Sequence, residues 1–458
     1  MSAQKTILAG STGAKLNSNV FTGGGDDDTA PLQAALDTAV ASGGVHLVMD
    51  GAALITGLRV HSNTTIECRD KTCGFFLADH ANQPVLANAN PSATERLDRH
   101  LTLLGGTYNQ NCRQQAHHVP ENVHYTKARE FVVGLRLLGV ENVLIRDVTV
   151  QDFRCFAILM TNWLHVTMEN IRLELPNFIP AANQDGIHVQ GPGRFLILRN
   201  ISGKTSDDFI ALNGDEEHNG QTSWFHPAAS VGPMSDIMVD TLIVEEAAQV
   251  VRVLSRENSQ DRITIRNVSG FYKSFGFYLS AWDYQSKGMQ GDFGAIFIEN
   301  VDLRQTEHIY HYTQPFLFRI SGRHQSLSLK NINYHNPSDD RRLILVEGRT
   351  DIPDMGDTPA DVKSLVIDGL HIQDDDCRQT KPYIGIEGRV RHFALRNSEV
   401  LLTNPRGPVK LIETSGDLAR VDTLSVANLT ATGLTAVVAD EIRAVKNLSL
   451  SNVSVTNP

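Results

Sequence analysis

The stretch Val143-Leu144-Ile145-Arg146-Asp147-Val148 is a short pattern that the chain repeats with variations. The pattern begins with apolar residues that alternate with other residues. A polar residue comes next, usually followed by Asn or Asp, and a further apolar residue ends the pattern. A period of two is typical of β-strands, and Asn or Asp directly after such a strand is typical of a turn. Ten further copies occur at Val166–Ile171, Ile197–Ile201, Ile237–Leu242, Ile263–Val268, Ile296–Val301, Leu327–Ile332, Leu365–Leu370, Phe393–Ser398, Leu424–Leu429 and Leu448–Val453.

The distance between copies predicts how the strands stack. Successive turn positions are separated by as few as 23 residues, from Asp147 to Asn170, and by as many as 41, from Asn200 to Thr241. The shortest spacing corresponds to one bare coil, and no helical pattern lies between the copies. A period of this size built from strands and turns predicts an all-β protein, a right-handed single-stranded parallel β-helix. The longest spacing contains the polar and aromatic insertion 215–233, which we expect to form a wall of the binding face.

Several of the turn asparagines also match the acceptor pattern for N-glycosylation, as in Asn200-Ile201-Ser202 and Asn267-Val268-Ser269. Asn tolerates the left-handed backbone conformation of a tight turn, and its amide can stack on the amide of the next coil. We therefore interpret these asparagines as a structural ladder.

A helix is expected before the repeats. Asp28 or Thr29 can cap its start, the run Asp26-Asp27-Asp28 suits a helix N-terminus, and Gly43-Gly44 can end it. An uncovered end of a stacked sheet would present unpaired backbone groups, so this helix is expected to cap the solenoid. We predict one β-helix domain over residues 1–458, with the capping segment at about 20–45 and regular coils from about 100 to 458. The apolar face of the helix is predicted to consist of Leu32, Ala35, Leu36, Ala39 and Val40.

Composition excludes several classes of partner. The 458 residues include 41 Lys and Arg against 52 Asp and Glu, which gives a net charge of −11. Without a basic tract, nucleic acid is not an expected partner. No apolar run approaches the roughly 20 residues of a membrane span, so a membrane partner is not expected either. The oligomeric state is left open.

The expected compartment is the cytoplasm. The first ten residues lack the charged start and apolar stretch of a secretory signal, and a secreted protein with its signal removed is the alternative. The five cysteines show no Cys-x-x-Cys spacing, and Cys68 and Cys73 are close enough in sequence for a disulfide.

Two acidic turns stand about one bare coil apart. The first reads Asn183-Gln184-Asp185-Gly186-Ile187-His188, and Ser206-Asp207-Asp208 follows 22 to 23 residues after Asp185. Neighbouring rungs lie about 4.8 Å apart, so three carboxylates would share a small space. Like charges at this distance raise one pKa, which gives one general acid beside ionised bases. Inverting glycoside hydrolysis uses this division of roles, with carboxyl groups about 6.5 to 9.5 Å apart.

These residues resemble a known family. The stretch from about Gly24 to Asn300 is similar to polygalacturonase-type glycoside hydrolases, which have Asn-x-Asp on one coil and Asp-Asp on the next. The segment from Gly105 to Asn111 also resembles the Gly-Gly-x-Ile-Asp-Gly segment of that family. The resemblance implies that Asp207 is the general acid and that Asp185 and Asp208 hold the attacking water. No cofactor is expected, and no metal is expected either, because Asn213, Asp215, Glu216 and His218 lack a recognisable metal-ligand spacing.

The chain departs from the family at two motifs. The Gly-His-Gly motif has no counterpart in Ala248–Ser255, and the Arg-x-Lys motif that binds a uronate carboxylate has none in Phe275–Ser280. His188 stands where the family has another Asp. We therefore expect hydrolysis of a poly- or oligosaccharide whose sugar the sequence does not specify.

Substrate contacts are expected from residues around these turns. Strand alternation turns Ile187 and Val189 inward and His188 outward. Arg252 and Arg256 are cations that can bind hydroxyls or an acidic group, and Trp282 offers an aromatic face to a sugar ring. The predicted substrate-binding residues are Asn183, His188, Asn213, Asp215, Arg252, Arg256 and Trp282.

Two other functions are compatible with this fold. A polysaccharide lyase would need a calcium site or a basic residue beside the carboxylates. A non-catalytic glycan-binding solenoid, similar to a phage tailspike, would use the same carboxylates only to hydrogen-bond its ligand. Unsaturated products would identify the lyase, and binding without turnover would identify the binding protein.

Overall fold

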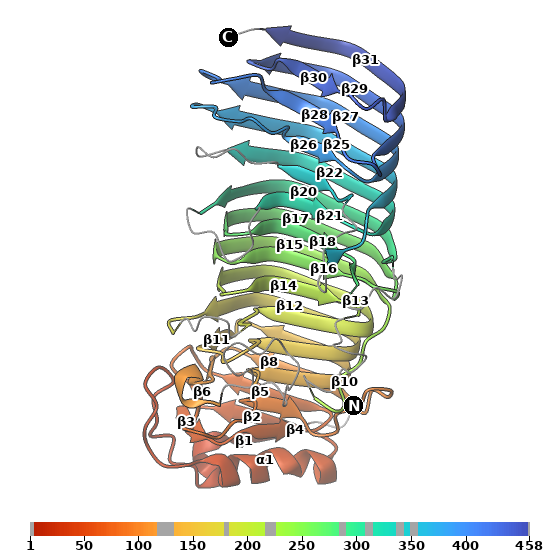
Figure 1. The fold of residues 1–458 in the computed structure, drawn as a ribbon. Coiled ribbons are helices and arrows are strands. Elements are labelled where there is room, and N and C mark those ends of the chain that lie inside the picture. The colour runs from red at the N-terminus through yellow and green to blue at the C-terminus, as the bar shows by residue number, and fades with distance from the viewer. Residues whose placement is uncertain are drawn as a thin grey trace. The chain divides into compact units, whose positions relative to one another are not determined.

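The computed structural model describes residues 4–116, 132–177, 183–215, 226–283, 290–306, 315–335, 343–348 and 356–456. The chain divides into two compact units, Met1–Met238 and Val239–Pro458. Parallel β-strands build both units (Figure 1). The prediction of a single domain stays a prediction.

In the first unit, strands that are one coil apart in sequence pair in parallel. One series runs through β1 (Lys5–Leu8), β2 (Val45–Met49), β5 (Thr64–Cys68), β8 (Asp98–Leu104), β10 (Leu135–Arg146), β12 (Ile158–Glu174) and β13 (Ile187–Lys204). A second series runs through β3 (Ala52–Ile55), β6 (Gly74–Leu77), β9 (Thr107–Asn109) and β11 (Thr149–Gln151). The shorter strands β4 (Leu58–Val60) and β7 (Leu86–Asn88) pair with each other, and β14 (Asp208–Asn213) pairs with β13. Parallel pairing therefore begins well before the repeated pattern at residue 143.

The second unit follows the same plan. One parallel series begins with β15 (Met234–Glu246), which contains the boundary between the units, and continues through β17 (Gln260–Tyr272), β20 (Phe293–Gln305), β22 (Arg323–His335), β25 (Asp361–Asp374), β27 (Arg389–Leu402), β29 (Arg420–Thr432) and β31 (Val445–Thr456). The other comprises β16 (Gln249–Leu254), β18 (Phe275–Ser280), β21 (Phe316–Ile320), β23 (Ile344–Val346), β26 (Ile384–Ile386), β28 (Lys410–Thr414) and β30 (Ala436–Ala439). A short antiparallel pair joins β19 (Trp282–Asp283) to β24 (Gly356–Asp357).

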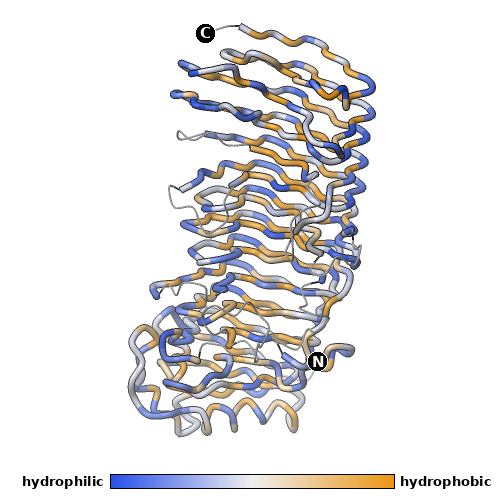
Figure 2. The backbone as a smooth tube through the Cα atoms, viewed as in Figure 1, coloured by the Kyte–Doolittle hydropathy of each residue, from blue (hydrophilic) through white to orange (hydrophobic). Residues whose placement is uncertain are grey.

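The core consists of inward-facing side chains stacked from coil to coil. In β12 and β13, Val166 lies opposite Leu196 and Met168 opposite Leu198, and all four side chains are buried. Figure 2 shows the resulting alternation of hydrophobic and hydrophilic residues along the strands. Each fully buried side chain of this size contributes about 1.5 to 3 kcal/mol, so the stacks account for much of the stability.

The predicted asparagine ladder is confirmed. All eleven predicted turn positions have φ angles between 50° and 80°, in the left-handed region. In the first unit, Asn170 Nδ2 donates to Asp147 Oδ1 at 2.7 Å, and Asn200 Nδ2 donates to Asn170 Oδ1 at 2.8 Å. In the second unit, one run starts from Asp240 and another from Asp368. Each run begins at an aspartate because the first side chain needs only to accept a hydrogen bond from the asparagine of the next coil.

The capping helix is present as α1 (Thr29–Ser42), with Asp28 before it and Gly43 after it at φ 75°. Leu32, Ala35, Leu36 and Ala39 are buried as predicted. Val40 was predicted to join them and is 70% exposed. At about 100° per residue, Val40 lies roughly 90° from the centre of the buried stripe, so it faces solvent. The Asp27 carboxylate accepts from the Thr29 amide at 2.9 Å, which supports the helix-start interpretation of the acidic run.

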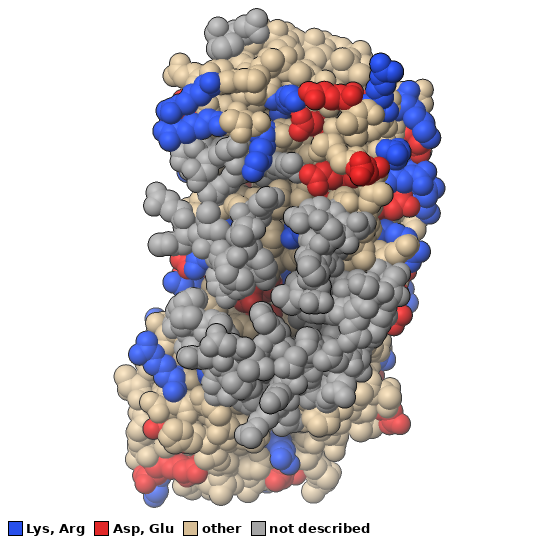
Figure 3. Space-filling view, viewed as in Figure 1, with Lys and Arg blue, Asp and Glu red and all other residues tan. Residues whose placement is uncertain are grey.

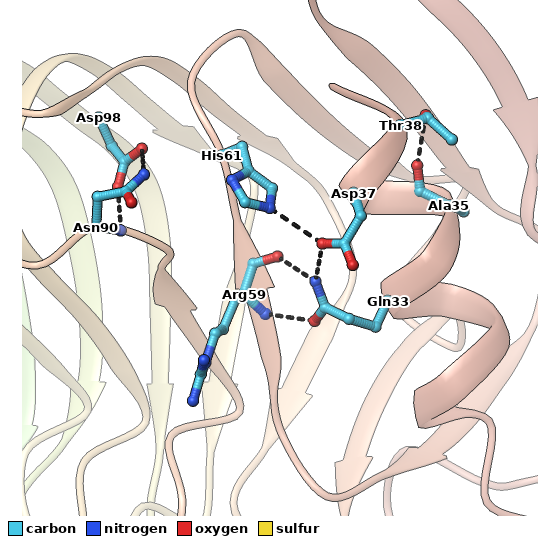
Figure 4. A network of polar contacts seen from close by, with 8 residues as sticks. All are labelled: Gln33, Ala35, Asp37, Thr38, Arg59, His61, Asn90 and Asp98. Atoms are coloured by element: carbon cyan, nitrogen blue, oxygen red, sulfur yellow. Dashed lines mark hydrogen bonds and ion pairs between the residues drawn. The ribbon is translucent and has the colours of Figure 1, made fainter. Parts of the chain in front are cut away.

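A side-chain amide attaches α1 to the edge of the first coils (Figure 4). Gln33 Oε1 accepts from the backbone amide of Arg59 in β4 at 2.8 Å, and Gln33 Nε2 donates to the Arg59 carbonyl at 3.1 Å. The same Nε2 reaches Asp37, which His61 also contacts at 3.0 Å. Gln33 thus takes the place of a neighbouring strand and satisfies edge groups that would otherwise be unpaired.

Charged residues of both signs are interspersed on the face shown in Figure 3. Ion pairs between neighbouring coils include Arg266 with Asp240 at 2.8 Å and Arg396 with Asp368 at 2.9 Å, both in the second unit. Such surface pairs contribute about 0 to 1 kcal/mol each. Within the described part of the chain, no helix is long and apolar enough to cross a bilayer. Cys68 and Cys73 are free thiols rather than a disulfide.

Candidate functional site

Asp185 and Asp208 occupy equivalent positions of two neighbouring coils in the first unit. β13 and β14 pair with Ile187 opposite Ile210, and the Gly186 amide donates to the Asp208 carbonyl at 2.8 Å. The same register carried back two residues sets Asp185 opposite Asp208, one rung of about 4.8 Å apart. The expected meeting of the two acidic turns is therefore present.

Gly186 permits this close stacking. A Cβ atom at this position would lie 2.4 Å from the Phe209 carbonyl oxygen and 2.5 Å from Leu173 Cδ1. Asn183 begins the same turn with a φ of 50°, a left-handed conformation that Asn tolerates. The Asn-x-Asp-Gly sequence is thus explained locally by turn geometry and by the next coil's backbone.

The three predicted catalytic carboxylates differ in burial. Asp185 and Asp208 are each 2% exposed, whereas Asp207 is half-buried. The Asp207 amide lies 3.4 Å from the Gln184 carbonyl, so Asp207 is tied to the turn that carries Asp185. Asp207 is the least buried residue of the three.

His188 is directed toward Asp185 and is buried. Its Nδ1 lies 2.7 Å from Asp185 Oδ2, and its ring stacks on Phe156 with centroids 4.0 Å apart. Ile187 and Val189 are buried on the inward side, as predicted, and His188 lies opposite Leu159 on one side and Ala211 on the other. The imidazole therefore fixes a carboxylate instead of lying on an open groove surface. A direct contact of His188 with substrate stays a prediction.

The thiol of Cys155 lies among the acidic residues. Its Sγ is 3.3 Å from the Asn183 carbonyl oxygen. Burial raises its pKa well above the ordinary value, and the charges of Asp185 and Asp207 raise it further. Cys155 is therefore an uncharged thiol. Asp185 and Asp207 lie near enough for their charges to raise its pKa.

The turn before Cys155 adds residues that the sequence analysis did not single out. Arg154 is 6% exposed, and its amide donates to Gln110 Oε1 at 2.7 Å. Gln184 Nε2 donates to the Phe153 carbonyl at 2.9 Å, which ties this turn to the Asn183–Asp185 turn. Arg154 lies one coil before Asp185 and Gln110 one coil further back, and this alignment of the turns is the signal that could have found them.

Asn213 and Asp215 lie at and just after the end of β14. Asn213 is opposite Gln190, and Gln190 is opposite Thr161. Thr161, Gln190 and Asn213 are fully buried, and Asp215 is 3% exposed. Thr161, Gln190 and Asn213 form a polar column five positions along the strands from the row of Asp185 and Asp208, and the contact of Asn213 and Asp215 with substrate remains a prediction.

The predicted wall formed by 215–233 is described only in part. Residues 216–225 lie outside the described residues. Ala229, which follows them, packs in a cluster with Val133, Leu138, Cys155, Phe156 and Leu159.

Three predicted binding residues belong to the second unit. The Arg252 guanidinium lies 5.9 Å from the centre of the Tyr278 ring, and Arg252 is 6% exposed. Arg256 is 3% exposed, and its carbonyl accepts from the Gly291 amide at 2.8 Å. Trp282 lies in β19 opposite Asp357, and its side chain is outside what the structure describes. Among the described residues, no group of three His, Cys, Asp or Glu is arranged to hold a metal ion.

Comparisons with known proteins yielded no matching family model and no curated relative. Solved structures match across most of the chain. A family 28 exopolygalacturonase from Yersinia enterocolitica has 12% identity and a TM-score of 0.55, with 98% of this chain and 78% of that chain covered.

Two further structures match in the same way. The tailspike protein of E. coli bacteriophage HK620 has 12% identity and a TM-score of 0.57, covering 94% of this chain and 75% of that chain. The A-module of a mannuronan C-5 epimerase from Azotobacter vinelandii has 12% identity and a TM-score of 0.52, covering 99% and 100%. At these identities the likeness concerns the fold alone. The chain has the polygalacturonase-like, right-handed parallel β-helix fold.

Proposed function

We propose that this protein is a glycoside hydrolase that cleaves a poly- or oligosaccharide with inversion at the anomeric carbon. The observation that carries the proposal is the position of Asp185 opposite Asp208 on neighbouring rungs, with Asp207 directly before Asp208. Three carboxylates at this spacing do not ionise independently, which favours one protonated acid beside ionised bases. The neighbours named in the comparisons include a hydrolase of this fold, which is consistent with the proposal.

In the proposed mechanism, Asp207 donates a proton to the glycosidic oxygen as the bond to the anomeric carbon breaks. Asp207 suits this role because it is the least buried of the three carboxylates. Asp185 and Asp208 hold a water molecule, take its proton and direct its oxygen to the opposite face of the sugar. One water molecule is consumed for each glycosidic bond that is cleaved, as hydrolysis requires.

His188 assists by positioning Asp185. Its ring is fixed on Phe156, and its Nδ1 contacts one carboxylate oxygen of Asp185 at 2.7 Å. A hydrogen bond donated to a carboxylate favours the charged form, so this contact helps to keep Asp185 ionised as a base. His188 replaces a family Asp and is a positioning residue in this proposal.

The proposal is tested by reducing-sugar release from a panel of neutral and acidic glycans with wild type and Asp207→Asn. We expect the variant to lose about 10²- to 10⁴-fold in kcat, as is typical when a general acid is removed. Asp375→Asn is the matched control, because Asp375 lies in another run of aspartates and is exposed. An unimpaired Asp207→Asn enzyme would refute the assignment of the acid. Products that absorb in the ultraviolet would instead indicate a lyase, and binding without release would indicate a glycan-binding protein.

A further inference from the structure

The aromatic ring of Phe156 packs on the imidazole that contacts Asp185. The Phe156 and His188 rings are nearly parallel, at 14° with centroids 4.0 Å apart, and both residues are fully buried. His188 Nδ1 lies 2.7 Å from Asp185 Oδ2. Packing on a ring face restricts the rotation of an imidazole, so the stack on Phe156 sets the direction in which Nδ1 points.

The turn that carries Phe156 is attached to the turn that carries Asp185. The Ala157 amide donates to the Asp185 carbonyl at 2.9 Å, and Cys155 Sγ lies 3.3 Å from the Asn183 carbonyl oxygen. Ala157 and Cys155 flank Phe156 on its two sides. The backbone of Phe156 therefore has a fixed position relative to the proposed base.

The hydrophobic cluster around Phe156 lies on the outer side of the strands. Leu159, a member of the cluster, lies opposite His188 in the pair of β12 and β13, on the face turned away from Ile187 and Val189. The other buried members are Val133, Leu138, Cys155 and Ala229. Phe156 and His188 are thus buried by a layer outside the solenoid core.

Part of this outer layer is a segment that follows β14 in the sequence. We call residues 226–233 the strap. The Ser230 hydroxyl donates to the Gly191 carbonyl in β13 at 2.9 Å, and the Gly232 amide donates to the carbonyl of the residue after β14 at 2.9 Å. Ala229 is 3% exposed and packs in the cluster of Phe156. The strap is therefore tied to the two strands that follow the acidic turns, and it packs in the layer that buries His188.

We propose that Phe156 is a positioning residue for the proposed base. Its ring holds the His188 imidazole in the plane in which Nδ1 reaches Asp185, and Ala229 on the strap holds Phe156 in place. This inference rests on the proposed hydrolase. Phe156 acts on the reaction through His188, so its ring should not matter for turnover once the imidazole is removed.

The first test measures kcat and KM with the glycan that gives the highest reducing-sugar release. We expect Phe156→Leu to lower kcat roughly 5- to 30-fold with little change in KM, because it removes the ring from an otherwise apolar cluster. Phe156→Tyr keeps the ring and should retain most of the wild-type kcat. Ala229→Gly should have a smaller effect in the same direction. Phe293→Leu is the matched control, because Phe293 is fully buried and stacks on the buried His324 with centroids 4.3 Å apart.

A double-mutant cycle tests whether Phe156 acts through the imidazole. In a His188→Phe background, Phe156→Leu should cause no further loss of kcat beyond about 2-fold. Losses that multiply would overturn the proposal, and so would a wild-type kcat in Phe156→Leu. Phe156→Met replaces Phe156→Leu if the latter does not fold, since it keeps more of the side-chain volume and still removes the ring.

NMR of the full chain labelled with ¹⁵N-histidine tests the contact without turnover. The proton between His188 Nδ1 and Asp185 should give a low-field signal that is absent from His188→Phe. We expect Phe156→Leu to lose this signal and Phe293→Leu to keep it. An unchanged signal in Phe156→Leu would overturn the proposal, whether or not a glycan is cleaved. Loss of the signal in a protein that hydrolyses no glycan would retain the positioning of Asp185 and refute the hydrolase.

Discussion

The contact between His188 and Asp185 shows how one residue can set the chemistry of another. His188 Nδ1 lies 2.7 Å from Asp185 Oδ2, and the two side chains are only 1% and 3% exposed. The imidazole places a hydrogen-bond donor directly beside this carboxylate. Substitution of His188 therefore tests the proposed base directly.

We predict that His188→Phe keeps the stack on Phe156 and removes the hydrogen bond to Asp185. Activity should fall about 10- to 100-fold, mainly in kcat, because the base is less well oriented and less readily ionised. The acidic limb of the kcat profile should move to higher pH for the same reason. The measurement is a pH–rate profile beside His165→Phe, since His165 also stacks on a phenylalanine, Phe195, and is exposed. An unchanged profile in His188→Phe would contradict the positioning role.

A second buried histidine predicts how stability depends on pH. His324 Nε2 lies 2.8 Å from the Ser321 carbonyl, the ring stacks on Phe293, and burial lowers the pKa of His324 to about 4. The unfolded chain has a histidine pKa of about 6.5. Above pH 6.5 neither state binds the proton. Between pH 6.5 and 4 the unfolded state binds it preferentially, so stability is lost as the pH falls.

The expected loss is on the order of 3 kcal/mol between about pH 6.5 and 4, from a difference of roughly 2.5 pKa units. Urea unfolding at several pH values should show a shallower dependence in His324→Leu. His392→Gln, at an exposed histidine, should retain the wild-type slope. A wild-type slope in His324→Leu would show that other groups cause the acid sensitivity.

Among the structural elements, the asparagine ladder was predictable from the sequence. The capping helix was predictable too, except for the position of Val40. The ladder depends on a local rule. Each position needs a residue that adopts the left-handed backbone conformation and a side-chain amide that reaches the next coil. Thr241 and Gly369 keep the left-handed conformation without the amide, and each follows an aspartate that starts a new run. Val40 was assigned wrongly because helical spacing alone does not define the width of the buried stripe.

We predict that Asn267→Ala destabilises the protein by about 2 to 5 kcal/mol. Asn267 donates to Asp240 at 2.8 Å and accepts from Asn300 at 2.9 Å, and its φ is 60°. Each lost hydrogen bond contributes about 0.5 to 1.5 kcal/mol, and the left-handed conformation costs Ala a further 1 to 2 kcal/mol or so. Asn267→Gly should lose only the hydrogen bonds. Equal and small effects of both substitutions in urea unfolding would show that the ladder does not stabilise this coil.

At the scale of the whole molecule, sequence and structure agree on the solenoid because its repeat is periodic. The neighbouring positions of Asp185 and Asp208 follow from one bare coil of 23 residues between them. Arg154, Gln110 and Cys155 could not be assigned in the same way. They lie in turns without a shared pattern, and coil lengths from 23 to 41 residues hide which turns align. The burial of His188 also depends on Phe156, one coil away, which alternation within a strand does not reveal.

Proton NMR of the first product tests most directly whether the three aspartates hydrolyse a glycosidic bond with inversion. Wild-type protein is mixed with the glycan that gives the highest reducing-sugar release, and the anomeric signals are followed before mutarotation. We predict that the anomer opposite to that of the substrate is formed first. Initial formation of the same anomer, or of an unsaturated product, would contradict it.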